Sequence, residues 1–151
     1  MLNNYEIKLI SSLQDHTGIK EMLTKHHYLG ESMPRGCKYW YCLFVGGKLS
    51  GVCAFGIPAG RNVVVKYGKN TLELRRFVLV PELNGKNVGS WFISKCLKEL
   101  KPYNIISYCD VSKGFTGALY KATNFISLGT QRQGSTRIMM QGKQYLHKEL
   151  Q

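Results

Sequence analysis

The spacing of hydrophobic positions predicts a strand, a helix and a hairpin in the first third of the chain. Apolar and polar residues alternate over residues 5–9, which is typical of a half-buried strand. Over residues 16–25 the apolar positions recur every three to four residues, which predicts a helix with one apolar face. Residues 38–45 and 49–57 are rich in aromatic and aliphatic residues, and Gly46 and Gly47 between them predict a tight hairpin turn.

The middle of the chain predicts a strand, a loop and a helix. Residues 72–80 (LELRRFVLV) predict a strand, whereas residues 90–100 (SWFISKCLKEL) have helical spacing. The loop between them, residues 81–89 (PELNGKNVG), contains two glycines. The elements expected afterwards are a strand over residues 104–109, a helical segment ending at residues 119–125, and closing strands over residues 125–128 and 136–141.

This order of elements predicts an α/β (α+β) protein with one mixed sheet. Strands that follow one another through short turns come first, and strands joined by helical crossovers follow. We expect about six to seven strands, with helices on both faces of the sheet. Residues 63–67 are a short apolar run after a break at residues 58–62, and they fit either a strand or part of a loop.

Length, hydropathy and cysteine usage indicate a single cytoplasmic domain over residues 1–151. A chain of 151 residues can bury a sizeable core. No apolar run approaches the roughly 18 residues that a membrane helix needs, and the first residues lack the order of a signal peptide. We therefore expect no membrane partner. The five cysteines form no CxxC pair, which predicts buried free thiols and neither a zinc ribbon nor a disulfide framework.

The charge of the chain changes this picture by suggesting a partner. The net charge is +12, from 21 Lys and Arg against 9 Asp and Glu, and it is spread along the chain. Such an excess favours a polyanionic partner, either nucleic acid or a phosphate-bearing cofactor. A generally basic surface without a specific partner is the alternative.

The glycine-bearing loop is a candidate phosphate site. After a strand, the backbone N–H groups of such a loop and the N-terminus of the next helix can hold a pyrophosphate. Gly85 and Gly89 would let a phosphate approach closely because no Cβ intrudes, and Lys86 adds a positive charge. A plain turn followed by a helix cap is the alternative.

This loop and a downstream segment resemble the GNAT superfamily of acyl-CoA-dependent acyltransferases. Its pyrophosphate loop reads Gln/Arg-Gly-x-Gly-x-Gly/Ala, which residues 84–89 (NGKNVG) resemble with Asn at the first and the middle-glycine positions. Residues 119–125 (LYKATNF), followed by Gly129, resemble the family's Leu-Tyr-x-x-x-Gly-Phe helix end. The resemblance implies a GNAT fold with a splay between two central parallel strands, and it places Tyr120 near the thioester of acetyl-CoA or a related acyl-CoA. The residues implied to bind that cofactor are Val78, Leu79, Val80, Asn84, Gly85, Lys86, Asn87, Val88, Gly89 and Ser90.

Three other pieces of the chain carry further motifs: HHYLGE at residues 26–31, ELRRFVL at residues 73–79 with NVGSWFISKCL after it, and SYCDVSKGFTGALYKATNF at residues 107–125. Together they resemble the phage Mom-type DNA modification proteins, a GNAT-like family. That family modifies the exocyclic amine of adenine in phage DNA and so masks restriction sites. The resemblance implies location in the host cytoplasm and catalytic roles for His27, Tyr28, Arg75 or Arg76, Asp110 and Tyr120.

Each implied catalytic residue also has a physical interpretation. His27 titrates near neutral pH and could act as a base, and Tyr28 could stack on an extruded base. Asp110 follows a central strand at its carboxyl end, where ligands of such sheets gather, and could hold the amine or take its proton. Adjacent strand residues face opposite sides, so only one of Arg75 and Arg76 can face the site, and we prefer Arg75. The alternatives are a solvated loop histidine, an aspartate that caps the next helix, and a surface arginine.

A metal site is also considered, because iron has been proposed for some Mom-type proteins. His27 and Asp110 could supply two ligands, but no third ligand is evident in the sequence. A credible site needs at least three, so no metal is predicted.

Aromatic and basic residues lie together around the first long strand. Arg35, Lys38, Tyr39 and Tyr41 are predicted to contact DNA, because a flipped base needs a stacking face with cations nearby. Trp40 points to the opposite face of the strand, and we expect it in the core.

The combined prediction is an enzyme that uses an acyl-CoA to alter the N6 amine of adenine in double-stranded DNA and so protects the DNA from restriction. One alternative is an ordinary GNAT N-acetyltransferase of a protein or small-molecule amine, which would require an acidic acceptor surface or a carboxylate-lined tunnel for the amine. The other is a cofactor-less GNAT-like domain that binds nucleic acid, which the asparagines at positions 84 and 87 keep open.

Overall fold

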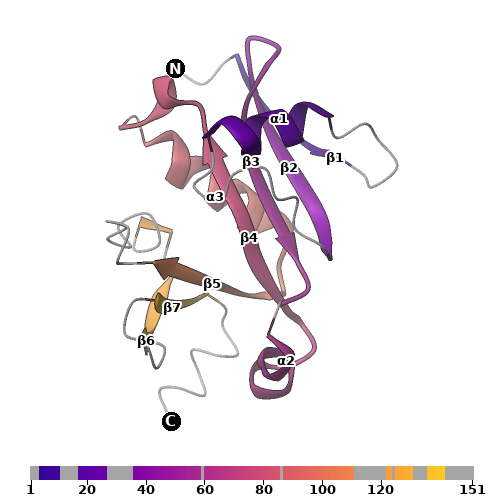
Figure 1. Ribbon diagram of the computed structural model, residues 1–151, viewed down its shortest axis with the longest axis vertical. Helices are drawn as coiled ribbons and strands as arrows, with labels where there is room; N and C mark the ends of the chain where they lie inside the picture. The colour runs from indigo at the N-terminus through magenta and orange to yellow at the C-terminus, as the bar shows by residue number, and fades with distance from the viewer. Residues whose placement is uncertain are drawn as a thin grey trace. The chain divides into compact units, whose positions relative to one another are not determined.

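The strands of the chain form one mixed sheet (Figure 1), seen in a computed structural model that describes residues 4–10, 17–26, 36–58, 60–85, 87–110, 122–123, 125–130 and 136–141. The sheet has seven strands in the order β1-β2-β3-β4-β5-β7-β6. In chain order the elements are β1 (Tyr5–Ile10), α1 (Thr17–His26), β2 (Cys37–Val45), β3 (Lys48–Gly56), α2 (Arg61–Tyr67), β4 (Thr71–Leu79), the 3-10 turn η1 (Pro81–Leu83), α3 (Val88–Glu99), β5 (Asn104–Asp110), β6 (Ile126–Thr130) and β7 (Thr136–Gln141).

Two compact units make up the chain. The first comprises Met1–Ile57 with Leu74–Cys96, and the second comprises Pro58–Glu73 with Leu97–Gln151. β4 contributes residues to both. Among the helices of the described residues, none is long and apolar enough to cross a membrane.

The first unit begins with an antiparallel meander. β1 pairs with β2 from Tyr5↔Val45 to Ile10↔Trp40, and β2 pairs with β3 through the turn at Gly46 and Gly47. Both glycines have positive φ, 58° and 82°, which a two-residue hairpin turn of this kind requires. The predicted strands, the hairpin and its turn are confirmed.

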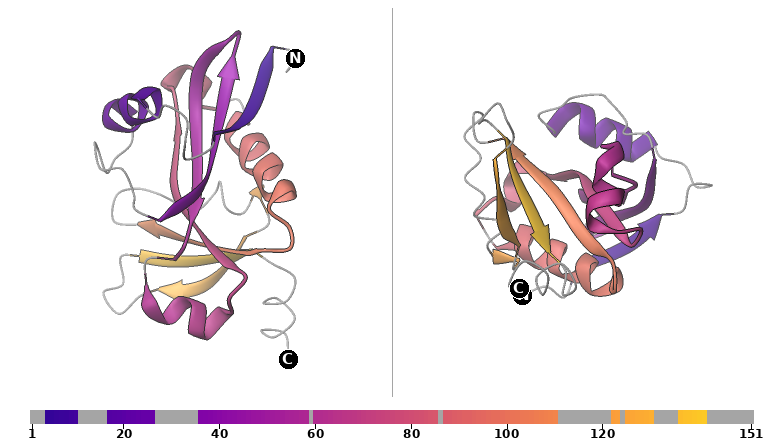
Figure 2. Two further views of the ribbon diagram at one scale, coloured as in Figure 1. Left: turned by 90° about the vertical axis from the view of Figure 1, so that its right-hand side faces the viewer. Right: turned by 90° about the horizontal axis from the view of Figure 1, so that it is seen from below.

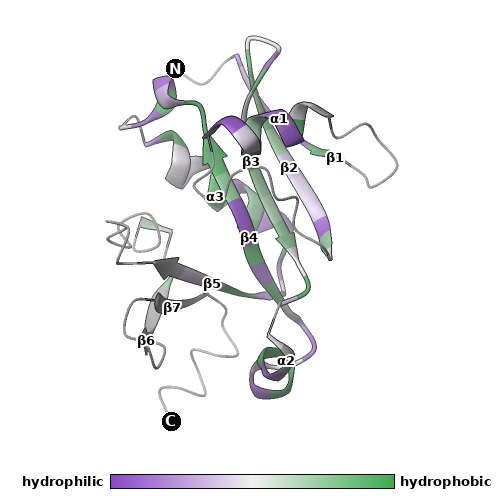
Figure 3. Cartoon of the chain, viewed as in Figure 1, coloured by the Kyte–Doolittle hydropathy of each residue, from purple (hydrophilic) through white to green (hydrophobic). Residues whose placement is uncertain are grey.

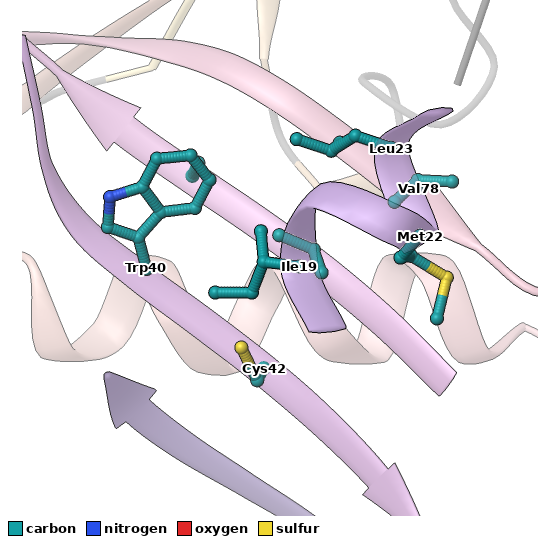
Figure 4. Close-up of a cluster of buried hydrophobic side chains, with 8 residues drawn as sticks. Ile19, Met22, Leu23, Trp40, Cys42 and Val78 are labelled. Carbon is teal, nitrogen blue, oxygen red and sulfur yellow. The ribbon is translucent and has the colours of Figure 1, made fainter. Parts of the chain in front are cut away.

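Helices cover both faces of this meander, as the left view of Figure 2 shows for α1 and α3. On one face, α1 inserts Ile19, Met22 and Leu23 into a buried cluster with Trp40 and Val78 (Figure 4). Leu23 is 0% exposed, and the predicted apolar face of the helix is the face that packs here.

The opposite face packs against α3. The rings of Phe77 and Phe92 lie 6.2 Å apart, and Phe92 is fully buried. Gly51 makes this contact possible, because a Cβ at that position would lie 2.7 Å from Leu79 Cδ2 and 3.3 Å from Phe92 Cε2. The helix begins at Val88, inside the stretch predicted as loop.

The second unit holds a parallel ladder and two antiparallel ones. The first three residues of β4 pair in parallel with β5, from Thr71↔Asn104 to Glu73↔Ile106, while both strands continue toward Leu79 and Asp110. β5 then pairs antiparallel with β7, and β7 with β6. The predicted strands 104–109, 125–128 and 136–141 are confirmed, whereas most of the helical segment ending at 119–125 lies outside the described residues.

The short apolar run at residues 63–67 corrects one prediction. It is neither a strand nor a loop but the greater part of helix α2. Gly60, in extended conformation, precedes the helix, and Gly68 with φ 104° ends it while its N–H donates to the Val64 carbonyl at 2.8 Å. The two glycines delimit a seven-residue helix. This context overrides the preference of three consecutive valines for a strand.

Candidate functional site

The loop between β4 and α3 is anchored at its entry. The Val80 N–H donates to the Ser50 carbonyl at 2.9 Å, which ties the end of β4 to β3. Pro81 then starts the 3-10 turn, in which Leu83 is buried and the Asn84 N–H donates to the Pro81 carbonyl at 3.1 Å. The loop therefore leaves the sheet in a defined direction.

Two residues of the loop adopt left-handed backbone conformations. Gly85 has φ 78° and Asn87 has φ 59°. Asn is among the side chains that tolerate this region best, which explains how Asn87 can replace a glycine here. A Cβ added at Gly85 would meet no atom within 4 Å, so this part of the loop is open to a ligand. Lys86, between them, lies outside the described residues.

The N-terminus of α3 follows directly. Val88 is buried and fixes the first turn, and the Trp91 N–H donates to the Asn87 carbonyl at 3.2 Å. The N–H groups of Val88, Gly89 and Ser90 belong to the first turn, which has no acceptors within the helix. Together with the partial positive charge of the helix end, they can bind an anion such as a pyrophosphate. The residues of the predicted cofactor loop that the structure describes are thus brought together.

At the end of β4, a ligand could contact the main chain more readily than the side chains. Val78 is buried in the cluster beneath α1, so its side chain belongs to the core and only its main chain could meet a ligand. Leu79 and Val80 are half-buried.

The two arginines of β4 lie on opposite faces of the sheet, as the strand geometry predicts. Arg75 shares the face of Phe77, which contacts α3, and Arg76 shares the face of Val78, which lies under α1. The Arg75 Nη1 donates to the Ile57 carbonyl at 3.1 Å, and the Arg76 Nη1 donates to the Arg75 carbonyl at 2.8 Å. Arg75 therefore also holds the end of β3; its role in catalysis stays a prediction.

One buried carboxylate was not predicted. Glu73 is 8% exposed in β4, on the same face as Arg75. Burial first, then the charge of Glu73 and the nearby Tyr67, raises the pKa of Tyr108, which keeps its phenol protonated. The signal in the sequence was a charged residue inside an apolar strand, which is seldom buried without a reason.

Four of the predicted catalytic side chains lie outside the part of the chain that the structure describes. His27, Tyr28 and Tyr120 lie outside the described residues. Asp110 is the last residue of β5, where its main chain pairs with Thr136, and its side chain is not described. Their convergence stays a prediction.

The predicted DNA contacts have different outcomes. Arg35 lies outside the described residues, Lys38 is exposed and Tyr39 is half-buried. Tyr41 is 2% exposed, and its ring meets Phe55 edge-on at 6.0 Å. The prediction for Tyr41 is corrected, because a ring enclosed in this way has no free face for a base. Trp40, at 4% exposed, is in the core as predicted.

Cys37, Cys42, Cys53 and Cys96 are free thiols, as predicted; the last three are buried, whereas Cys37 is half-buried. Burial, and then the charge of Cys96, raises the pKa of Cys42 to about 12, and burial likewise raises that of Cys53. These thiols are protonated at neutral pH. Among the described residues, no group of three or more His, Cys, Asp or Glu could hold a metal ion, and His27 is not among them.

Comparisons with known proteins agree on family and fold. The family model of the Mom protein family matches residues 6–151. Among solved structures, the chain is similar to an aminoglycoside acetyltransferase AAC(6')-Ib in complex with coenzyme A, with 14% identity, 97% and 99% of the two chains covered, and a TM-score of 0.71. It is also similar to YncA, a putative acetyltransferase from Salmonella typhimurium with acetyl-CoA (13%, 93% and 94%, 0.69).

A third similar structure is the PaiA N-acetyltransferase from Thermoplasma acidophilum in complex with coenzyme A. It is 18% identical, the match covers 92% and 99% of the two chains, and the TM-score is 0.67. No curated protein sequence matches the chain. The structural likenesses confirm the predicted GNAT fold.

Proposed function

The chain belongs to the Mom protein family, and on this basis we propose that it is an acyl-CoA-dependent enzyme that modifies the exocyclic N6 amine of adenine in double-stranded DNA. The modification would protect the DNA of a phage or prophage from restriction. The observation that carries this proposal is a family match over residues 6–151 combined with an open, left-handed loop before α3.

The residues at this loop fit an acyl-CoA. Gly85 presents backbone to open space, and the first-turn amides of α3 supply donors and positive potential for a pyrophosphate. The main chain at the end of β4 would bind the pantetheine arm. When bound, the cofactor would supply an activated acyl group as a thioester.

The acceptor, the exocyclic amine of adenine, needs catalytic groups to activate it. The exocyclic amine of adenine is a poor nucleophile, because its lone pair is delocalised into the ring, so a base and an oriented carboxylate are needed. Asp110 at the end of β5 would hold the amine and take its proton, His27 and Tyr28 would contact the flipped adenine, and Tyr120 would hold a proton near the thioester. The net charge of +12 suits a duplex better than a cationic amine substrate.

Nucleoside analysis tests the proposal. DNA from cells that express the chain should resist restriction enzymes and yield a deoxyadenosine nucleoside of increased mass. An Asp110→Asn variant, which keeps the size of the side chain, should lose both effects. Unmodified DNA together with acetyl-CoA binding measured by calorimetry would indicate an ordinary acetyltransferase instead. Absence of both would indicate a nucleic-acid-binding domain without cofactor.

A further inference from the structure

The connection between β3 and β4 is longer than the fold requires. The two strands are consecutive in the chain and adjacent in the sheet. The preceding pair, β2 and β3, is joined by the two glycines of a tight turn. The connection over residues 57–70, by contrast, contains the whole of α2. A loop that carries extra structure of this kind commonly serves binding.

All the charged residues of this connection are basic. Arg61, Lys66 and Lys69 are its charged residues, and residues 57–70 contain no Asp or Glu. Lys66 and Lys69 are exposed, and the Lys66 Nζ lies 5.2 Å from the centroid of the Tyr67 ring. Val65, in the same turn of helix, is 84% exposed. Figure 3 shows this mixture of hydrophobic and hydrophilic residues along α2.

We infer that α2 and the turn after it form a second DNA contact, in which Lys66 and Lys69 bind backbone phosphates; this inference rests on the proposed function. Exposed lysines without acidic neighbours in the segment match the charge of a duplex. Phosphate contacts position a protein without reading sequence, so this contact would strengthen binding to any duplex without adding sequence specificity. Asn62 and Asn70, both exposed, add uncharged donors to the same segment.

Salt-dependent binding to a short duplex tests the inference. Fluorescence anisotropy should compare the full chain, a Lys66→Gln/Lys69→Gln variant and a Lys95→Gln/Lys98→Gln control between 50 and 200 mM salt. The control removes two lysines of α3 that are also exposed. Loss of two phosphate contacts should make the slope of log K against log salt shallower by about 2 in the α2 variant and leave the control near the wild type.

The outcomes separate this inference from the proposed function. If the wild type binds DNA and the α2 variant keeps its slope, the α2 contact is wrong and the proposed function stands. Equal changes in both variants would show a general charge effect and overturn the α2 contact. If the wild type does not bind DNA, the proposed function fails as well. Binding of phosphatidylserine vesicles that depends on the α2 lysines, with an unchanged DNA slope, would assign α2 to a membrane surface.

Discussion

The closest backbone approach among the described glycines is at Gly56, and replacing this residue with alanine should destabilise the protein. Gly56 is the last residue of β3 and pairs with Cys37 at the start of β2. A Cβ there would collide with the Gly36 carbonyl oxygen and lie 2.6 Å from the Cys37 Cα. Gly56 is not among the glycines with positive φ, so the cost comes from crowding and not from backbone conformation.

The magnitude follows from what the added methyl group must displace. Overpacking in a tight site costs about 1–3 kcal/mol. The neighbours at Gly56 are main-chain atoms, and moving them strains the bond from the Ile57 N–H to the Gly36 carbonyl (3.1 Å), which is worth about 0.5–1.5 kcal/mol. We therefore expect Gly56→Ala to lower the free energy of unfolding by about 3 kcal/mol. For a chain of this size that corresponds to a Tm lower by roughly 10 °C.

A matched substitution in α1 provides the control. Gly18 is exposed in α1, and a Cβ there would meet only Leu49 Cδ2 at an ordinary 3.4 Å. Gly18→Ala should be neutral or stabilising by up to about 1 kcal/mol, because alanine has the higher helix propensity. Thermal and urea unfolding followed by circular dichroism would measure both variants. The reasoning is refuted if Gly56→Ala unfolds at the wild-type temperature, or if Gly18→Ala loses as much stability.

Three further predictions concern the core, the loop and the thiols. Leu23→Ala should cost about 2–5 kcal/mol in urea unfolding, because this side chain of α1 is fully buried in the cluster against the sheet, whereas Lys25→Ala on the exposed side of the helix should stay within about 0.5 kcal/mol. Asn87→Gly should keep acetyl-CoA affinity in calorimetry, whereas Asn87→Val should lose about 5- to 30-fold, since a β-branched residue resists φ 59°; equal affinities would contradict the loop's role. The Cys42 thiol has its ordinary pKa of 9.0 in the unfolded chain and a pKa of about 12 in the folded protein. The free energy of unfolding should therefore fall as the pH rises from about 9, because only the unfolded thiol loses its proton there. Urea titrations of Cys42→Ala should show a weaker dependence of stability on pH.

Local pattern was sufficient for most of the secondary structure. The spacing of Ile19, Met22 and Leu23 predicted the buried face of α1, and the glycine pair predicted the hairpin, because each signal depends only on neighbouring residues. The family motifs likewise identified the loop before α3, whose left-handed residues Gly85 and Asn87 are set by local backbone preference.

Long-range packing was beyond the reach of these patterns. Tyr39 and Tyr41 lie on the same face of β2, yet Tyr39 is half-buried whereas Tyr41 is buried and packs edge-on against Phe55 of the next strand. The three valines at 63–65 are typical of a strand, but in the connection between β3 and β4 they belong to a short helix delimited by Gly60 and Gly68. Burial of Glu73 beside Tyr108 depends on a parallel pairing between β4 and β5, residues far apart in the chain. A sequence pattern records which face of an element is apolar, whereas the partner that covers that face is chosen when distant segments pack together.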